Sequence, residues 1–435
     1  MKREGSTIAW LTTLLVLSGA IFAAWPVHAD SAPSLKVDAA APIKIGFIAS
    51  LTGTGAKDGP DMVKGIKLYL EQIHYKIGNH KVELHVEDDE SSILMAIAKA
   101  KKLVSKDKVD VLAGVIFSPF AYAVAPVADE SHTPFLVSTS TADDLTQRKR
   151  RKWVLRICST SSQISQPLGE YAAKRLHLKK IVTVGCNYAH PFEVVAGFHK
   201  TFEDNGGKII QKLWLPMDAV DFTEALSTIR PDADAVFLAL VGEPCRLVPA
   251  QLHKLRPHLV ILASSATLEE NILQDIGPYV DGAISSNNHS EVLNNATNRR
   301  FIADYRAAYG SLPSTYARGA YTAGAWIHQA VDALHGNIGN REELLSALKR
   351  VELKESINGP IRLDSFGGLI ENIYIRKVEK VGGKYQNSII QVYPHVSQFW
   401  NAKPDNFLKN PVFGKDYPPC IHCAIEPKLN ANNHP

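Results

Sequence analysis

Two short turns that carry hydroxyl groups could bind a small anion. They are Phe117-Ser118-Pro119 and Thr141-Ala142-Asp143-Asp144, and each follows an apolar run of the length of a strand. Ser118 suits the cap of a helix that starts at Pro119, and the spacing that begins at Thr141 resembles a capping box. Backbone N–H groups at helix starts are unpaired and partly positive. We therefore expect Ser118 and the Ser140-Thr141 turn to bind an anion, although most such residues only cap helices.

Three consecutive carboxylates, Asp88-Asp89-Glu90, could instead perform acid–base or metal chemistry. The sequence contains no G-x-S-x-G elbow, no H-E-x-x-H pair and no P-loop, and its 16 histidines are scattered. We interpret the three carboxylates as a solvated loop and helix start. We expect neither an enzyme nor a bound cofactor or metal.

The five cysteines are too few to form the main framework of an exported protein of this size. Cys420 and Cys423 are the one close pair, and a local disulfide in the tail is the favoured interpretation. A zinc site would need four ligands, and no second pair supplies them. A redox motif would start a helix after a strand, whereas Pro418-Pro419 precedes this pair.

A basic run from Arg148 to Lys152 raises the alternative of nucleic-acid binding. No aromatic residues interleave the run, and the formal charge of the whole chain is only +4. A solvated loop is the better interpretation, and we expect no nucleic-acid partner.

Alternating apolar runs and amphipathic stretches predict two doubly wound α/β domains, each with a mostly parallel sheet. The first series has expected strands at 43–48, 82–86, 109–115 and 135–137, with helices after Pro60, at 93–103 and after Pro119. The second series runs through 181–184, 192–203, 209–213, 225–229, 235–240 and 259–262. Residues 299–350 are expected to be mainly helical, short strands follow at 361–363 and 372–378, and a surface tail begins after Tyr393.

The first 29 residues have the pattern of a secretory signal peptide. A short basic start precedes a largely apolar stretch from Ile8 to Ala24, and Val27-His28-Ala29 forms the expected cleavage site. An uncleaved anchor is the alternative, because about 17 apolar residues lie at the lower limit for a span. Cleavage after Ala29 predicts export to the periplasm.

The chain resembles periplasmic solute-binding proteins of the leucine/isoleucine/valine-binding type over about 43–393. The resemblance rests on the order of several segments, none decisive alone: IKIGFIASLTGTGAKDGPDMVKGIKLYLEQI from Ile43, VELHVEDDES from Val82, KLVSKDKVDVLAG from Lys102, the turn at Phe117-Ser118, LVSTSTADDLTQR from Leu136, NYAHPFEVVAGFHKTFEDNGG from Asn187 and NGPIRLDSFGGLIENIYIRKV from Asn358.

This resemblance implies a type I periplasmic binding fold, in which two Rossmann-like lobes are joined by a three-segment hinge. The crossings would lie near Arg156, near Ser286 and within 364–372. The N-terminal lobe would comprise 42–157 and 288–368, the C-terminal lobe 158–287 and 369–400, and the tail 401–435. Such lobes can close over a ligand as rigid bodies.

The resemblance also implies ligand contacts at Ser118, at the Ser140-Thr141 turn and in the loop from Leu51 to Gly59. The sequence departs from the amino-acid-binding pattern after the strand at 259–262, where Ala263 to Thr267 contains no acid. It also has His190 where an aromatic residue is common. A ligand ammonium would then lack a counter-charge, which disfavours a free amino acid unless Glu243 or Asp58 substitutes.

We therefore expect a small carboxylate with an apolar or aromatic body. Ser118 and the Ser140-Thr141 turn would hold the carboxylate, and His190 or Ser265 would contact a ring substituent, although His190 is also typical of a surface or capping histidine. Stacking walls would come from Phe117, Tyr188, Phe192, Tyr316 and Tyr321. The candidate ligand-binding residues are Asp58, Phe117, Ser118, Ser140, Thr141, Tyr188, His190, Gly242, Ser265 and Tyr316.

The resemblance implies that the protein delivers its solute to the permease subunits of an ABC importer in the inner membrane. We expect it to act as a monomer. Two alternatives stay open: a binding protein for branched-chain or other amino acids, and a ligand-sensing subunit of a signalling system, since the fold supports both uses.

Overall fold

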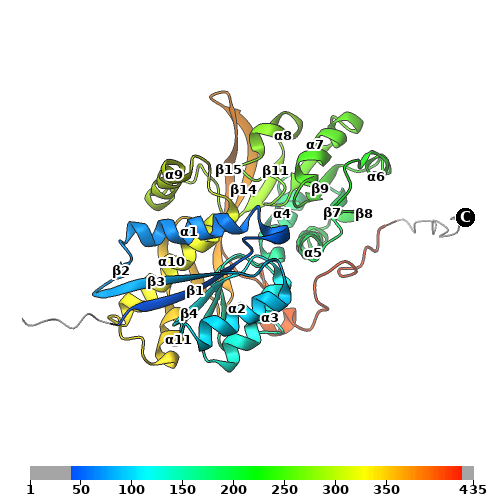
Figure 1. Ribbon diagram of the computed structural model, residues 1–435. Helices are drawn as coiled ribbons and strands as arrows, with labels where there is room; N and C mark the ends of the chain where they lie inside the picture. Colours follow the sequence, from blue (N-terminus) through cyan, green and yellow to red (C-terminus); the bar gives the residue numbers. More distant parts are fainter. Residues whose placement is uncertain (1–40, 424–435) are drawn as a thin grey trace, which may run out of the picture. The chain divides into compact units, whose positions relative to one another are not determined.

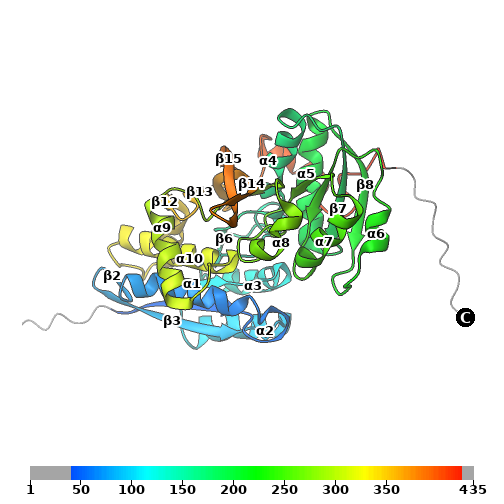
Figure 2. The ribbon, with the colours of Figure 1, turned by 90° about the horizontal axis from the view of Figure 1, so that it is seen from above.

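The computed structural model describes residues 41–423, in which two β-sheets are flanked by helices (Figure 1). The predicted signal peptide, residues 1–29, lies outside the described residues. Figures 1 and 2 both show the green elements grouped around one sheet and the blue, cyan and yellow elements around the other. The predicted fold class, with two α/β lobes, is confirmed.

The first sheet is parallel apart from a short edge strand. Its spatial order is β2 (Lys76–Ile77), β3 (His80–Asp88), β1 (Ile43–Ala49), β4 (Val111–Gly114), β5 (Phe135–Val137) and β6 (Val154–Arg156). β2 pairs antiparallel with β3, and the other pairs are parallel. Six of the seven residues of β1 are buried, as expected for a parallel strand covered on both faces.

Helices cover both faces of the first sheet. They are α1 (Gly59–Gln72), α2 (Ile93–Ser105), α3 (Ser118–Glu130), α9 (Ala296–Tyr309), α10 (Thr315–Ala333) and α11 (Arg341–Arg350). Successive residues of β1 point to opposite faces. Phe47 packs with Ile66 of α1 and Trp326 of α10, whereas Ile48 packs with the buried residues of α2 and α3.

The second sheet combines parallel strands with an antiparallel edge. Its order is β12 (Glu352–Ser356), β13 (Gly359–Leu363), β14 (Leu369–Val381), β11 (Ile284–Asn287), β10 (Val260–Ala263), β9 (Ala235–Ala239), β7 (Lys180–Cys186) and β8 (Lys208–Leu215), and β15 (Lys384–Val396) pairs with β14. The strands from β11 to β8 are parallel to one another. This arrangement is the second doubly wound series that the sequence predicts.

The helices around the second sheet also form two layers. They are α4 (Ser161–Lys174), α5 (Ala189–Asp204), α6 (Thr223–Ser227), α7 (Pro244–Leu255) and α8 (Leu273–Val280). α4 and α5 share one buried cluster, in which Phe198 stacks on Phe237 with ring centroids 4.1 Å apart. α6, α7 and α8 bury Leu226, Val248 and Ile276 in the other cluster.

Three segments connect the two lobes, and buried hydrogen bonds join them. Ser159 follows β6, Asn288 follows β11, and Glu371 lies in β14. Ser159 Oγ donates to the Glu371 carboxylate, and Asn288 Nδ2 donates to Glu371 Oε2 at 2.8 Å and to Ser159 Oγ at 3.1 Å. Each predicted crossing lies beside one of these residues. The exact lobe boundaries stay a prediction.

The hairpin of β14 and β15 departs from the sequence analysis. Each strand has 13 residues, whereas a short strand at 372–378 and none at 384–396 were predicted. In β15 only Asn387 and Val396 are buried, and the apolar side chains of Ile389, Ile390 and Val392 stay partly or fully exposed. Pairing with β14 along its length, rather than burial, holds β15 in place.

Residues 397–423 pack over the surface, as predicted for a tail. They include α12 (Pro404–Phe407) and a buried cluster of Phe399, Phe407 and Phe413 that contacts Phe366. The structure pairs Cys420 with Cys423 in a disulfide. Residues 424–435 of the predicted tail lie outside the described residues.

Candidate functional site

The carboxyl ends of β4 and β5 bring two predicted hydroxyl groups together. Ser140 Oγ donates to Ser118 Oγ at 3.4 Å, and both residues follow the ends of neighbouring parallel strands. Within residues 41–423, the backbone N–H groups of Ser140 and Thr141 donate no hydrogen bond. This edge therefore presents hydroxyl and main-chain donors with capacity for a ligand.

Neither turn caps a helix in the way the sequence suggested. α3 begins at Ser118, so Phe117 rather than Ser118 occupies the cap position, and no side chain caps the helix. The turn after Ser140 forms a short 3₁₀-helix, η2 (Asp143–Thr146), with Ala142 at its cap. The predicted capping box is wrong: Ala142, not Thr141, precedes the 3₁₀-helix, and the buried carboxylates of Asp143 and Asp144 bond other groups.

The contact of Asp143 reaches the second lobe, whereas the contact of Asp144 is local. The Asp143 carboxylate accepts a hydrogen bond from the backbone N–H of Ser162 at 3.1 Å, and Arg148 Nη1 pairs with the Asp144 carboxylate at 3.0 Å. The Arg156 guanidinium is fully buried and donates to the carbonyl oxygen of Ala142 at 2.6 Å. The charged side chains of Asp143, Asp144 and Arg156 thus hold the turn that carries Ser140 and Thr141.

His190 lies in the first turn of α5, beside the hydroxyl groups of Thr141 and Ser161. Its Nδ1 is 3.0 Å from Thr141 Oγ1 and 2.9 Å from Ser161 Oγ. Burial lowers the pKa of His190 to about 4, so the imidazole is neutral at pH 7. If Nδ1 accepts from one of these hydroxyls, Nε2 carries the proton and can donate it to a ligand. We call Ser118, Ser140, Thr141 and His190 the hydroxyl edge.

Glu193, one turn after His190, was missed by the sequence analysis. Its carboxylate accepts the backbone N–H of Asp143 at 3.3 Å. Burial raises the pKa of Glu193 well above its ordinary value, and the negative charge of Asp143 raises it further. Its position three residues after His190 places both on one face of α5, which is the only signal in the sequence that could have suggested it.

A second set of predicted residues lies near Tyr316. Burial raises the pKa of its phenol, and the nearby charges of Asp58 and Glu269 and the side chains of Tyr188 and Cys245 raise it further. The pKa of Tyr188 is raised by burial and then by Glu193, so Tyr188 lies near both sets. The structure therefore brings Asp58, Tyr188 and Tyr316 together.

Glu269 changes the conclusion drawn from the sequence after β10. Residues 263–267 contain no acid, but Glu269 and Glu270 follow directly and are largely buried. Arg318 Nη2 lies 3.5 Å from Glu269 Oε1, and Arg376 Nη1 lies 2.8 Å from Glu270 Oε1. We call these four residues the ion cluster. An acid is thus present beyond β10, and an arginine already faces it.

The remaining candidates are Phe117, Gly242 and Ser265. Phe117 packs edge-to-face on Phe120, with ring centroids 5.3 Å apart. Gly242 adopts a positive φ of 67° in the turn before α7, and Ser265 is partly buried in the loop after β10. Within residues 41–423, no hydrogen bond joins Gly242 or Ser265 to the hydroxyl edge.

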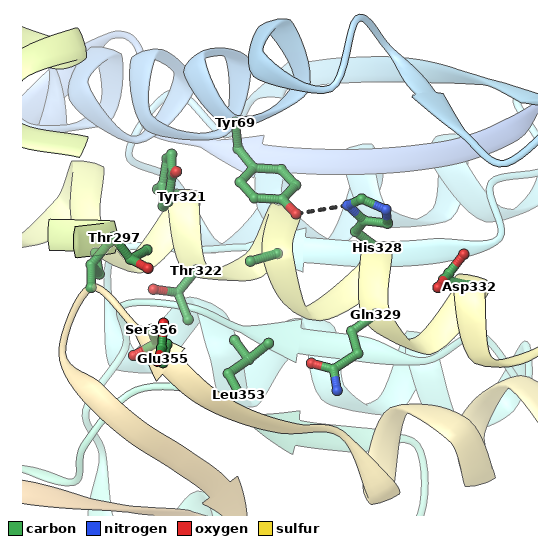
Figure 3. Close-up of a pocket in the computed structure, with 12 residues that line it drawn as sticks. Tyr69, Thr297, Tyr321, Thr322, His328, Gln329, Asp332, Leu353, Glu355 and Ser356 are labelled. Atoms are coloured by element: carbon green, nitrogen blue, oxygen red, sulfur yellow. Dashed lines mark hydrogen bonds between the residues drawn. The ribbon is translucent and has the colours of Figure 1, made fainter. Parts of the chain in front are cut away.

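Two other predicted aromatic walls lie elsewhere. Phe192 packs edge-to-face on Trp214 of β8, with ring centroids 4.6 Å apart. Tyr321 lines a separate cavity in the first lobe, together with Tyr69 (Figure 3).

Asp88 of the acidic run has a structural role. Its carboxylate accepts hydrogen bonds from the backbone N–H of Leu51 at 2.8 Å and from Thr52 Oγ1 at 2.7 Å. These bonds hold the loop after β1, which contains η1 (Gly53–Gly55) and leads to Asp58.

Comparison with known proteins assigns the family. The family model described as periplasmic binding protein matches residues 42–384. The Leu/Ile/Val-binding protein homolog 6 of Brucella suis biovar 1 is 26% identical over 366 residues, which cover 81% of this chain and 91% of that protein. An ABC transporter substrate-binding protein from Sphaerobacter thermophilus is 27% identical with a TM-score of 0.79, covering 82% of this chain and 99% of that one.

A solute-binding protein of an ABC transporter from Rhodopseudomonas palustris BisB5, solved with 3,4-dihydroxybenzoic acid, is also 27% identical. Its TM-score is 0.75, and the match covers 82% of this chain and 98% of that one.

The chain belongs to the periplasmic binding protein family. It is a solute-binding protein of an ABC transporter rather than an enzyme, since the relatives that share its full fold are solute-binding proteins. Proteins of this family bind small molecules outside the cytoplasm and work with transporter permeases. Within residues 41–423, no helix combines the length and hydropathy needed to cross a bilayer.

Proposed function

We propose that the protein captures a small aromatic carboxylate between its lobes and delivers it to the permease of an importer. The observation that carries this proposal is the hydroxyl edge, where the main-chain N–H groups of Ser140 and Thr141, which have no partner within residues 41–423, lie beside a neutral imidazole. Such an edge supplies donors for an anion but no charge to bind a cation. The R. palustris relative solved with 3,4-dihydroxybenzoic acid supports the ligand class.

In this proposal the ligand carboxylate accepts hydrogen bonds from Ser118 Oγ and from the N–H groups of Ser140 and Thr141. Phe117, Tyr188 and Tyr316 contact the ring. His190 Nε2 or the Ser265 hydroxyl contacts a ring substituent, and Asp58 and Gly242 border the site. Closure of the lobes would remove the carboxylate from water, which makes each of these hydrogen bonds stronger.

A branched-chain or other amino acid is the second candidate, and Glu269 is the observation that favours it. Its carboxylate could face a ligand ammonium, and the Brucella relative is named for leucine, isoleucine and valine binding. Arg318 lies 3.5 Å from that carboxylate, however, and already offsets its charge. A ligand ammonium would therefore compete with a buried guanidinium.

Titration calorimetry with the mature protein separates the two candidates. The panel is benzoate, 4-hydroxybenzoate, 3-phenylpropionate, leucine, isoleucine and valine. We expect one site per chain for an aromatic acid and a preference for 4-hydroxybenzoate over benzoate, because His190 or Ser265 can bond the ring hydroxyl. Binding of the amino acids alone would overturn the aromatic-acid proposal and leave the solute-binding class intact.

We further propose export to the periplasm with removal of residues 1–29. Intact-mass spectrometry of the protein purified from the periplasm should give a chain that begins at Asp30. Loss of solute uptake in a strain without this protein would support transport, whereas unchanged uptake with a lost transcriptional response would support the sensor alternative.

A further inference from the structure

A cavity of about 340 Å³ lies in the first lobe, outside the candidate site (Figure 3). Tyr69 of α1 and Tyr321 of α10 form one wall, and Leu353 and Glu355 of β12 lie opposite (Figure 3). Its volume falls within the range of small-molecule pockets. Apart from Tyr321, which was predicted as a stacking wall, no residue predicted to contact the ligand lines it.

The cavity and the candidate site share no residue, although α10 contributes to both: Tyr316 of the candidate site and Tyr321 of the cavity lie about 7.5 Å apart along its axis at 1.5 Å per residue. Along α1, Asp58 precedes the helix, whereas Tyr69 lies in its last turn, about 16 Å further along the axis at 1.5 Å per residue. Occupation of one site therefore does not require occupation of the other.

The two tyrosine rings are fixed, and their hydroxyls are already paired. The rings meet edge-to-face with centroids 5.1 Å apart. Tyr69 Oη is 2.8 Å from His328 Nδ1, and Tyr321 Oη donates to Gln72 Oε1 at 2.7 Å. With their hydroxyls engaged, the rings offer the cavity their aromatic surface, which attracts cations.

The charge of the lining is negative. Asp332 and Glu355 are exposed at the rim and form no ion pair or side-chain hydrogen bond within residues 41–423. No lysine or arginine lines the cavity. Burial lowers the pKa of His328, although Asp332 opposes this effect, so the imidazole is neutral at pH 7 and does not offset the two carboxylates.

We propose that this cavity is a second binding site, which takes a small organic ammonium ion with an apolar body. The ammonium group lies between the carboxylates of Asp332 or Glu355 and the tyrosine rings. The apolar body packs on Leu353 and Ala325. This preference is opposite to that of the hydroxyl edge, which favours an anion.

Calorimetry with 2-phenylethylamine tests the proposal, with 2-phenylethanol as a neutral probe of the same body. We expect the amine to bind at a single site and the alcohol to bind at least about tenfold more weakly, because only the amine gains the charge and aromatic contacts. The double variant Asp332→Asn with Glu355→Gln keeps the shape of the cavity and should weaken the amine about twofold to fivefold, because both carboxylates are exposed. Ala325→Leu, which fills the cavity, should abolish binding.

Glu130→Gln serves as the matched control, because Glu130 is an exposed carboxylate at the end of α3 and does not line the cavity. Its affinity for the amine should equal that of the wild type. No binding of the amine at millimolar concentration, equal affinity for the alcohol, or unchanged affinity in the isosteric double variant would overturn the proposal. The isosteric variant decides the matter even if Ala325→Leu fails to fold.

Discussion

The hydroxyl edge lies beyond the carboxyl ends of β4 and β5, whereas the ion cluster joins the loop after β10 to α10 and β14. The two regions differ in whether their polar groups already have partners. The hydroxyl edge holds neutral side chains and main-chain N–H groups that have no partner within residues 41–423. In the ion cluster, Arg318 and Arg376 face Glu269 and Glu270 in buried surroundings. Neutral hydrogen-bond donors can lack a partner in the ligand-free protein at a low cost in free energy, whereas buried charges must be paired there.

This difference assigns separate roles to the two regions. The hydroxyl edge should determine ligand affinity and contribute little to stability. The ion cluster should contribute to stability and determine how α10, β14 and the loop after β10 are held. Substitutions in the hydroxyl edge should therefore change ligand affinity, and substitutions in the ion cluster should change the free energy of unfolding.

The largest expected effect is loss of stability in Arg376→Met. Arg376 is fully buried and donates to Glu270 Oε1 at 2.8 Å and to the carbonyl oxygen of His289 at 3.0 Å. Its removal leaves Glu270 as an unpaired buried charge, which costs about 3–5 kcal/mol of unfolding free energy. Urea denaturation measures this loss. The double variant Arg376→Met with Glu270→Met should recover most of the stability, and a single variant as stable as wild type would contradict the assigned role.

The carboxyl group of Glu371, in one of the three segments that connect the lobes, should make stability depend on pH. Burial raises the pKa of Glu371 to about 7, against the opposing hydrogen bonds of Ser159 and Asn288. The folded state then binds the proton more tightly than the unfolded state. Its contribution is complete below the ordinary pKa of 4.5 and is lost as pH rises through about 7. This loss amounts to about 3 kcal/mol.

Glu371→Gln removes this titration and keeps a hydrogen-bonding side chain at the hinge. Denaturation at several pH values should show a difference between the variant and wild type that changes between pH 4.5 and 7.5, with the variant gaining relative stability at high pH. Parallel pH profiles for the two proteins would contradict a titrating carboxyl at this position.

At the hydroxyl edge, Ser118→Ala should weaken binding of an aromatic acid by about tenfold to a hundredfold. This range follows from the loss of one hydrogen bond to a carboxylate, about 1.5–3 kcal/mol. Calorimetry measures the affinity, and the unfolding free energy should change by less than about 0.5 kcal/mol. Ser105→Ala, at an exposed serine of α2, is the control and should bind as wild type does. Equal affinities of the two variants would remove Ser118 from the site.

The smallest effect concerns His190. Its pKa of about 4 predicts that affinity for an aromatic acid is constant between pH 6 and 8, because the imidazole stays neutral throughout this range. Calorimetry at three pH values tests this. A several-fold change in affinity that disappears in His190→Asn would show that the imidazole titrates near neutrality and that its charge contributes to binding.

The sequence predicted most strands and helices because apolar periodicity records burial. β5 agrees with the expected 135–137, and β1 extends the expected strand by one residue. β15 was missed because it is held by pairing with β14 and is mostly exposed. The capping box at Thr141 failed because Asp143 accepts a hydrogen bond from Ser162 of α4, a tertiary contact that local spacing does not reveal.

Part of the candidate site could also be predicted. The rule that ligands bind beyond the carboxyl ends of parallel strands pointed to Ser118 and Thr141, and His190 lies within hydrogen-bonding distance of Thr141. Glu193 and Glu269 were missed because their relevance depends on which helix and loop of the second lobe lie beside η2 and α10. Separation along the chain gives no information about that contact.

A crystal structure of the mature protein with 4-hydroxybenzoate tests the central claim most directly. We predict that the ligand carboxylate lies within hydrogen-bonding distance of Ser118 Oγ and of the N–H groups of Ser140 and Thr141, with the ring hydroxyl facing His190 or Ser265. A carboxylate bound instead by Arg318, or a ligand located only in the cavity of Tyr69 and Tyr321, would contradict it.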